Sequence, residues 1–164
     1  NGDEPSSAFT ERHGIAWREH TVRGKDFREE PASALVAERL GLDVGELVFR
    51  RHLVREARGH AEEIHTSWYK LATVAGSPMT NPDIQPAPGG TVAELKAIGV
   101  IVTRWAEDIQ ARLATPEEAR ILGLPSVAAV IDDARVAYDA SGPVGVDSVV
   151  YPGERCVIRY YVAL

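Results

Sequence analysis

The chain has 164 residues, of which 45% are hydrophobic and 26% charged, a composition typical of one globular domain. Its formal net charge of −6 argues against nucleic-acid binding by this chain alone, because phosphate contacts need many basic residues. The single cysteine excludes a disulfide framework. The sequence shows no signal peptide or long apolar run, so we expect a cytoplasmic location and no membrane partner.

The first 42 residues predict a linker, a strand and a helix. Residues 1–14 are polar and without periodicity, as in a linker or a disordered terminus. Residues 15–22 alternate loosely as a strand does. Residues 31–42 predict a helix, with Pro31 in its first turn and Gly41 at its end.

A hairpin, a long loop and a second helix follow. Residues 46–70 contain two β-rich runs around Arg58, which predicts a hairpin. Residues 72–90 are crowded with Pro and Gly and predict a loop, and loops of this length are often functional. The next helix opens with Thr91 and Glu94, which are spaced as in a capping box.

The next segment predicts a strand and then a short helix. Residues 100–114 indicate the strand. Residues 115–124 predict the helix, with Thr115 as N-cap and Glu118 completing a capping box.

The end of the chain predicts a second hairpin and a last strand. Residues 127–152 predict a hairpin that turns at Ser141-Gly142, and residues 156–164 predict the strand. AERLGL at 37–42 matches ARILGL at 119–124. We therefore expect an α+β domain of two pseudo-repeated halves, with a mainly antiparallel sheet and its helices to one side.

The stretch HAEEIH, from His60 to His65, resembles a zinc-hydrolase motif superficially. Zinc-binding histidines on a helix are four residues apart, whereas these are five apart. On a strand, an odd spacing sends two side chains to opposite faces. We therefore expect no metal site here and no cofactor.

Two pairs of opposite charge have the same spacing. Glu63 follows Arg51 by the same number of residues as Asp147 follows Arg135, each across a predicted hairpin. One interpretation is a pocket between the hairpins, in which the arginines bind an anion and the carboxylates bind hydroxyl or amine groups. The alternative is two cross-strand ion pairs on a solvated face.

Strand parity adds polar candidates to this pocket. Glu63, His65, Ser67 and Tyr69 share one face of their predicted strand, which would line a cavity or form the wet side of the sheet. Their neighbours Ile64 and Trp68 are expected to face the core. Thr91 opens a helix, where backbone N–H groups favour an anion, although an ordinary N-cap is the more common role of a threonine at this position.

The sequence gives no reason to expect an enzyme. Cys156 lies in an apolar run without a base nearby, and neither Ser67 nor Ser148 has a nucleophile-elbow context. The glycines fit neither a Walker loop nor a dinucleotide fingerprint. An enzyme or carrier, and a pure dimerisation module, remain the alternatives to a binding domain.

Three stretches resemble the UTRA domain, the effector-binding domain of GntR-type transcriptional regulators of the HutC subfamily. They are RRHLVREARGHAEEIHTSWY, TRWAEDIQARLATPEEARILGLPS and YDASGPVGVDSVVYPGERCVIRY, the last including Arg155 and Tyr160. The resemblance covers residues 31–164 and implies a chorismate-lyase-like fold within a domain of residues 15–164. It also implies a homodimer that binds a small polar or anionic metabolite and contacts operator DNA only through an N-terminal winged helix-turn-helix outside this chain.

Residue by residue, the resemblance places ligand contacts on part of this sequence. The family's Arg and Glu fall on Arg51 and Glu63, its Ser or Thr at the helix start on Thr91, and its late Tyr on Tyr151. The sequence departs from the family at Gly145 and Ser148, where many members have acidic residues. The expected ligand-binding set is Arg51, Glu63, Ser67, Thr91, Arg135, Asp147 and Tyr151.

Overall fold

A computed structural model describes residues 20–87 and 89–159. The predicted linker of residues 1–14 lies outside this range, as do Tyr160 and the rest of the predicted last strand. No helix within the described residues is long and apolar enough to cross a membrane.

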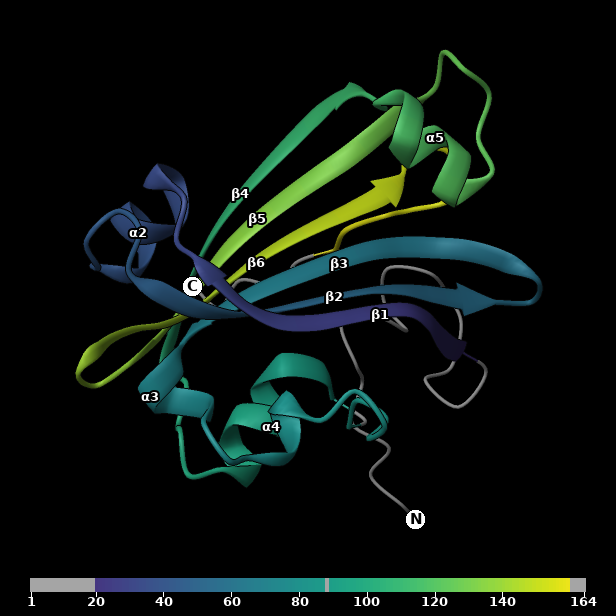
Figure 1. The fold of residues 1–164 in the computed structure, drawn as a ribbon. Helices are drawn as coiled ribbons and strands as arrows, with labels where there is room; N and C mark the ends of the chain where they lie inside the picture. The colour runs from purple at the N-terminus through teal and green to yellow at the C-terminus, as the bar shows by residue number, and fades with distance from the viewer. Residues whose placement is uncertain (1–19, 88, 160–164) are drawn as a thin grey trace.

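The described residues form one six-stranded antiparallel sheet (Figure 1). The strand order is β1-β2-β3-β6-β5-β4, so β3 and β6 meet at the centre. The strands are β1 (His20–Pro31), β2 (Leu47–Ala57), β3 (His60–Lys70), β4 (Arg104–Leu113), β5 (Ala129–Asp139) and β6 (Gly142–Pro152). Each half therefore consists of an outer strand, a helix and a hairpin, which confirms the predicted α+β class and the two pseudo-repeated halves.

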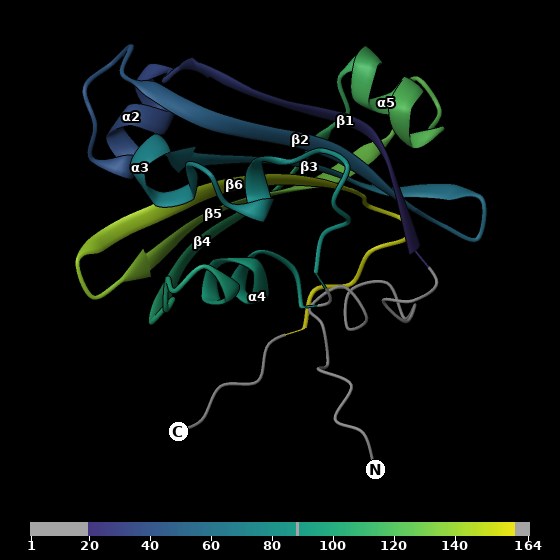
Figure 2. The same ribbon diagram turned by 60° about the horizontal axis from the view of Figure 1, so that its bottom comes forward.

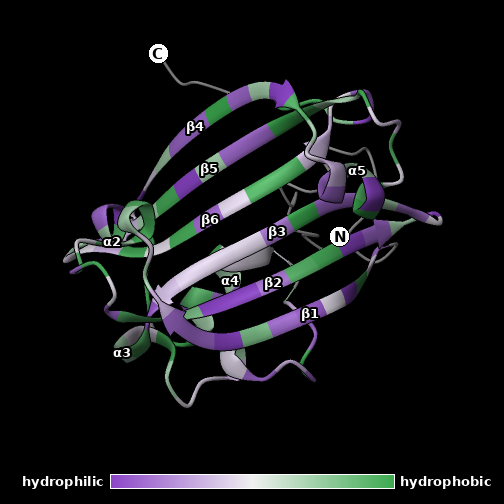
Figure 3. Ribbon diagram, turned by 45° about the horizontal axis from the view of Figure 1, so that its top comes forward, coloured by the Kyte–Doolittle hydropathy of each residue, from purple (hydrophilic) through white to green (hydrophobic). Residues whose placement is uncertain are grey.

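The helices lie on both faces of the sheet. The sequence had suggested that they lie on one side, and that expectation is wrong. Helices α2 (Ala34–Leu40) and α5 (Pro116–Leu122) cover opposite ends of one face, the α2–α5 face, and leave the middle of the strands between them (Figure 3). Helices α3 (Leu71–Val74) and α4 (Gly90–Ala97) and the 3₁₀ helix η2 (Pro78–Thr80) lie on the other face, the α4 face (Figure 2).

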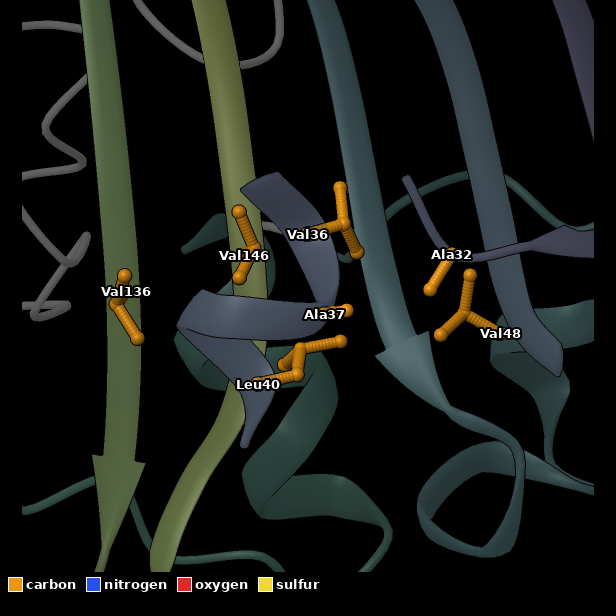
Figure 4. Packing of buried hydrophobic residues seen from close by; sticks show 7 residues of the cluster. All are labelled: Ala32, Val36, Ala37, Leu40, Val48, Val136 and Val146. Atoms are coloured by element: carbon orange, nitrogen blue, oxygen red, sulfur yellow. The ribbon is translucent and has the colours of Figure 1, made fainter. Parts of the chain in front are cut away.

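Helix α2 is held to the sheet by a small apolar cluster. Val36 and Leu40 pack against valines of β2, β5 and β6 (Figure 4), and full burial of such a side chain stabilises by about 1.5–3 kcal/mol. Ser33 caps the helix by accepting a hydrogen bond from the Val36 N–H, and Gly41 ends it at φ 65°. Pro31, predicted in the first turn, is instead the last residue of β1.

The starts of helices α4 and α5 differ in how they are capped. Helix α5 has the predicted capping box, with the Thr115 side chain and Glu118 each bonded to the other's backbone N–H. Helix α4 has no side-chain cap, because Gly89 in a left-handed conformation (φ 95°) occupies the N-cap position. The predicted capping box of Thr91 and Glu94 is therefore wrong.

Both predicted hairpins are present. Arg58 and Gly59 form the first turn with φ values of 52° and 81°, as a tight turn between twisted strands requires. The second turn comes one residue earlier than predicted, because Gly142 already pairs with Asp139. Residues 156–159 have no regular structure, so the start of the predicted last strand is not a strand.

Candidate functional site

One row of directly paired residues crosses all six strands on the α4 face. It contains an aromatic ring at one edge, a carboxylate at the other, and two arginines, a hydroxyl and a carboxylate between them. In strand order the row is Phe27, Arg51, Ser67, Asp147, Arg135 and Glu107. Four of the predicted ligand-binding residues are therefore neighbours in space, and Arg51, Ser67 and Asp147 are each buried.

Arg51 is tied to helix α4. Its two terminal nitrogens donate to the two carboxylate oxygens of Glu94, each at 3.0 Å, and its guanidinium lies 4.9 Å from the centre of the Phe27 ring. Burial alone would lower the pKa of Arg51, but nearby Tyr69 and Glu94 raise it, so the side chain stays charged. Glu94 thus occupies the bidentate position that the sequence assigned to a ligand anion.

Arg135 is surrounded by acceptors at the other end of the row. Its Nε donates to Glu107 at 2.7 Å and to Asp133 at 3.1 Å, and a terminal nitrogen donates to Asp133 and, at 3.1 Å, to the Tyr151 hydroxyl. This contact places the predicted Tyr151 at the site. Asp133 is fully buried, which is tolerable for a carboxylate that is paired.

Glu63 lies outside the row and joins it through His65. On one side Glu63 accepts from Arg55 Nε, and on the other its Oε1 lies 3.6 Å from His65 Nδ1. His65 Nε2 lies 3.5 Å from Asp147 Oδ1 and 3.2 Å from Ser67 Oγ. Glu63, His65 and Asp147 therefore form a continuous buried chain.

The charge states of His65 and Asp147 follow from the groups that surround them. Burial alone would lower the pKa of His65, but Asp147 and Glu63 outweigh it and raise that pKa. Burial alone would raise the pKa of Asp147, but His65, Ser67 and Arg135 lower it. Burial and Asp147 raise the pKa of Tyr69, which therefore remains a neutral phenol.

The equal spacing of the two charge pairs does not correspond to equivalent places in the structure. Arg135 pairs directly with Asp147, but Arg51 pairs with Ser67, and Glu63 pairs with Arg55. The interpretation as ion pairs on a solvated face is also wrong, because Arg51, Glu63 and Asp147 are buried.

The residues predicted to share one face of β3 do so, and that face is the more buried one. Glu63, His65, Ser67 and Tyr69 are all buried on the α4 face. On the opposite face Ile64 is buried together with Ala61, whereas Thr66 and Trp68 are half-buried. The polar face is therefore enclosed and not wet.

His60 and His65 do not lie on opposite strand faces, contrary to the expectation from their odd spacing. A register shift next to Glu62 places His60 opposite Ala57 and His65 opposite Leu53, and these two partners share one strand face. His60 is exposed at the hairpin, whereas His65 is buried beside Asp147 of the row. Among the described residues, no group of three His, Cys, Asp or Glu side chains is arranged to hold a metal ion.

Three polar atoms near the middle of the row are buried without a hydrogen bond of normal geometry in the described part of the chain. Within residues 20–87 and 89–159, no hydrogen-bond partner is found for Arg51 Nε, the Tyr69 hydroxyl or Asp147 Oδ1. A buried polar atom without a partner costs about 1–3 kcal/mol. A small molecule with both donor and acceptor groups would recover that cost at this place.

Helix α4 supplies the remaining predicted residue, Thr91, which is buried in its first turn. The sequence did not indicate Glu94 as a member of the site, and it placed Tyr69 on the polar strand face but not in the ligand-binding set. Tyr69 has the same strand parity as Ser67, and this signal could have identified it. Glu94 was assigned to a helix cap, and no local signal in the sequence linked it to Arg51.

The described cavities lie on the other face of the sheet. One of about 340 Å³ is lined by α2 and the strands beside it, including Trp68 and Asp132. The other, of about 420 Å³, lies beside α5 and includes His52 and Thr66. Ser148 lines both cavities and the predicted Asp147 lines the first, but Arg51, Glu63, Thr91 and Tyr151 line neither.

The chain has recognisable relatives. The UTRA domain model matches residues 17–156. A protein described as a GntR-family transcriptional regulator superposes with a TM-score of 0.83 at 29% identity, over 100% of this chain and 68% of that one. No curated protein matches significantly.

Two further solved structures show the same fold. The ligand-binding domain of a GntR-family regulator from Bordetella bronchiseptica has a TM-score of 0.77 at 22% identity, over 88% of this chain and 89% of that one. The C-terminal domain of the histidine utilization repressor from Pseudomonas syringae pv. tomato has a TM-score of 0.76 at 19% identity, over 88% and 99%.

Proposed function

The chain belongs to the UTRA domain family, and on that premise we propose that it is the effector-sensing domain of a GntR-type transcriptional regulator of the HutC subfamily. The effector is a small polar or anionic metabolite that binds on the α4 face, at the row from Arg51 to Arg135. DNA binding belongs to a winged helix-turn-helix module outside these 164 residues. The regulator acts as a cytoplasmic homodimer, without a cofactor.

The buried polar row is the observation that carries this proposal. A sheet normally buries apolar side chains, and burying charges costs free energy unless they are paired. Here Arg51, Ser67 and Asp147 are buried side by side, while Arg51 Nε and Asp147 Oδ1 are left without hydrogen bonds in the described residues. Such an arrangement favours specificity for a ligand over stability of the domain alone.

Helix α4 gives the site a way to respond. The Arg51–Glu94 ion pair joins the helix to the sheet, and an effector anion that binds Arg51 competes with Glu94 for the same two nitrogens. Binding therefore favours a different position of α4. An effector with different affinities for the two positions shifts their populations, and this shift is transmitted to the DNA-binding module.

A thermal-shift screen against metabolites tests the function. An effector present at about one hundred times its dissociation constant adds about 2.7 kcal/mol to the free energy of unfolding. Amino acids, their breakdown products and sugar phosphates cover the proposed range. The absence of any stabilising compound, polar or apolar, would contradict the sensor function.

Titration calorimetry with the identified effector tests the site. Arg51→Ala should weaken binding by roughly 2–5 kcal/mol, because the buried partner group is left unpaired. Asp147→Asn keeps the shape of the site and removes its charge, so it tests the row without depriving Glu94 of Arg51. Arg120→Ala, on the exposed side of α5, is the control, and equal affinity in all three variants would place the effector elsewhere.

A further inference from the structure

The two edge strands of the sheet differ in how they resist pairing with another chain. Strand β1 has a register shift between Arg23 and Asp26, with Gly24 at φ 61°, and it ends in Pro31. A bulge, charged side chains and proline are the usual means of protecting an edge. Strand β4 pairs with β5 over ten residues without any shift, so its outer edge is straight.

Strand β4 also has an apolar stripe on one face. Trp105, Ile109 and Leu113 pair with Ala137, Asp133 and Ala129 of β5 and therefore all lie on the α4 face. They are 36%, 45% and 65% exposed. In the described part of the chain, no strand pairs with the outer side of β4. A straight edge with exposed apolar side chains is a place for another strand.

We propose that β4 pairs with β4 of a second copy of this chain, antiparallel, with Ile109 opposite Ile109 of the second copy on the two-fold axis. This register places Trp105 opposite Leu113 at both ends, so the apolar stripe becomes continuous across the junction. Asp108 then faces Gln110, and Ala106 faces Arg112. No like charges are directly opposed, and a two-fold interface must be self-complementary in this way.

Neighbouring registers are less favourable. An axis at Asp108 would oppose the two copies of Asp108 and place Arg104 against Arg112, and like charges directly opposite destabilise a sheet. An axis at Gln110 would place Glu107 against Leu113 and leave Trp105 without an apolar partner. Only the axis at Ile109 aligns the stripe with itself.

The self-complementary stripe favours a second copy of this chain as the partner of β4. A peptide from another protein could add to the same edge by strand addition. Binding of such a peptide would not require the apolar stripe to be self-complementary about a two-fold axis. The β4 edge is then the place where the proposed homodimer forms, and it is separate from the effector site. A variant that loses the dimer should still bind the effector.

Disulfide trapping tests the register in the full 164-residue chain. Directly opposite residues of an antiparallel pair have Cβ atoms about 4.5–5.5 Å apart, close to what a disulfide requires. Ile109→Cys should therefore form a covalent dimer under mild oxidation, and the buried Cys156 contributes little background. Val127→Cys, an exposed position away from β4, is the matched control. Equal cross-linking of both variants, or none, overturns the proposal.

Sedimentation equilibrium provides the second test. Ile109→Lys places two ammonium groups on the axis and should raise the dissociation constant of the dimer at least about tenfold. Val44→Lys, at an exposed loop position, should leave it unchanged. A monomeric wild-type chain at tens of micromolar, or a dimer insensitive to Ile109→Lys, overturns the interface. The effector thermal shift of the Ile109→Lys variant shows separately whether the sensor function stands.

Discussion

At Gly145 the sheet lacks a side chain, and the ring of Tyr69 occupies the space. A Cβ atom built at this position would lie 2.9 Å from Cε1 and 3.1 Å from Cδ1 of that ring. Tyr69 is fully buried, so the ring cannot move away freely. Packing against Tyr69 therefore explains why this chain has glycine at position 145, where the sequence comparison expected an acidic residue.

Gly145→Ala should destabilise the domain by roughly 1–3 kcal/mol, the usual cost of forcing extra volume into a packed core. Urea unfolding measures the loss. In a Tyr69→Leu background the ring is gone, so the same substitution should then cost much less. Equal costs in both backgrounds would show that the ring is not the obstacle.

His65 makes stability depend on pH. Because Asp147 and Glu63 raise its folded-state pKa against the opposing effect of burial, its charged form stabilises the fold below the unfolded pKa of about 6.5. This contribution disappears as pH rises through the folded pKa. The difference in free energy of unfolding between wild type and His65→Gln should therefore be larger at pH 6 than at pH 9, and a difference that grows with pH would contradict the assignment.

At the scale of elements, a buried ion pair joins α4 to the sheet, in addition to the apolar packing of Leu95. Arg51 and Glu94 have side chains that are 5% and 11% exposed, and removing one partner of a buried pair costs about 3–5 kcal/mol. Glu94→Ala should therefore destabilise the domain by that order and accelerate hydrogen exchange in α4. Lys96→Ala, on the same helix without this contact, is the control, and unchanged exchange in Glu94→Ala would remove the role of the pair as a tether.

The helix starts allow a matched comparison of two threonines. Thr115→Ala removes the N-cap of α5 and should cost about 0.5–2 kcal/mol in chemical unfolding. Thr91→Ala removes no capping bond, because Gly89 is the N-cap of α4. Its unfolding cost should be the smaller of the two, and the reverse order would restore the capping box predicted for Thr91.

These threonines also show what local sequence can and cannot predict. The helix at Thr115 and the turn at Arg58-Gly59 were predicted because their signals lie within a few neighbouring residues. Thr91 and Glu94 have the same local pattern as Thr115 and Glu118, but a contact with Arg51, 43 residues away, decides the role of Glu94. The row from Arg51 to Arg135 depends on the strand order and on the register shift near Glu62. Neither can be predicted from a short stretch of sequence.

For the whole molecule, the row links the effector site to the proposed dimer edge. Arg135 faces the site and donates to Glu107 on β4 at 2.7 Å, and Glu107 lies between Trp105 and Ile109 on the same strand face. An effector that draws Arg135 toward itself weakens its bond to Glu107 and leaves a carboxylate within the apolar stripe. Effector binding and dimerisation are then coupled through one side-chain contact.

This coupling is reciprocal, because the factor by which the effector changes the dimer dissociation constant equals the factor by which dimerisation changes effector affinity. We expect a factor in the usual range of roughly 5–150, with weaker effector binding in the dimer. Titrations at protein concentrations below and above the dimer dissociation constant measure it. Glu107→Gln should reduce the factor toward one, whereas Glu117→Gln on the exposed side of α5 should not. An effector affinity independent of protein concentration in the wild type would leave the two equilibria uncoupled.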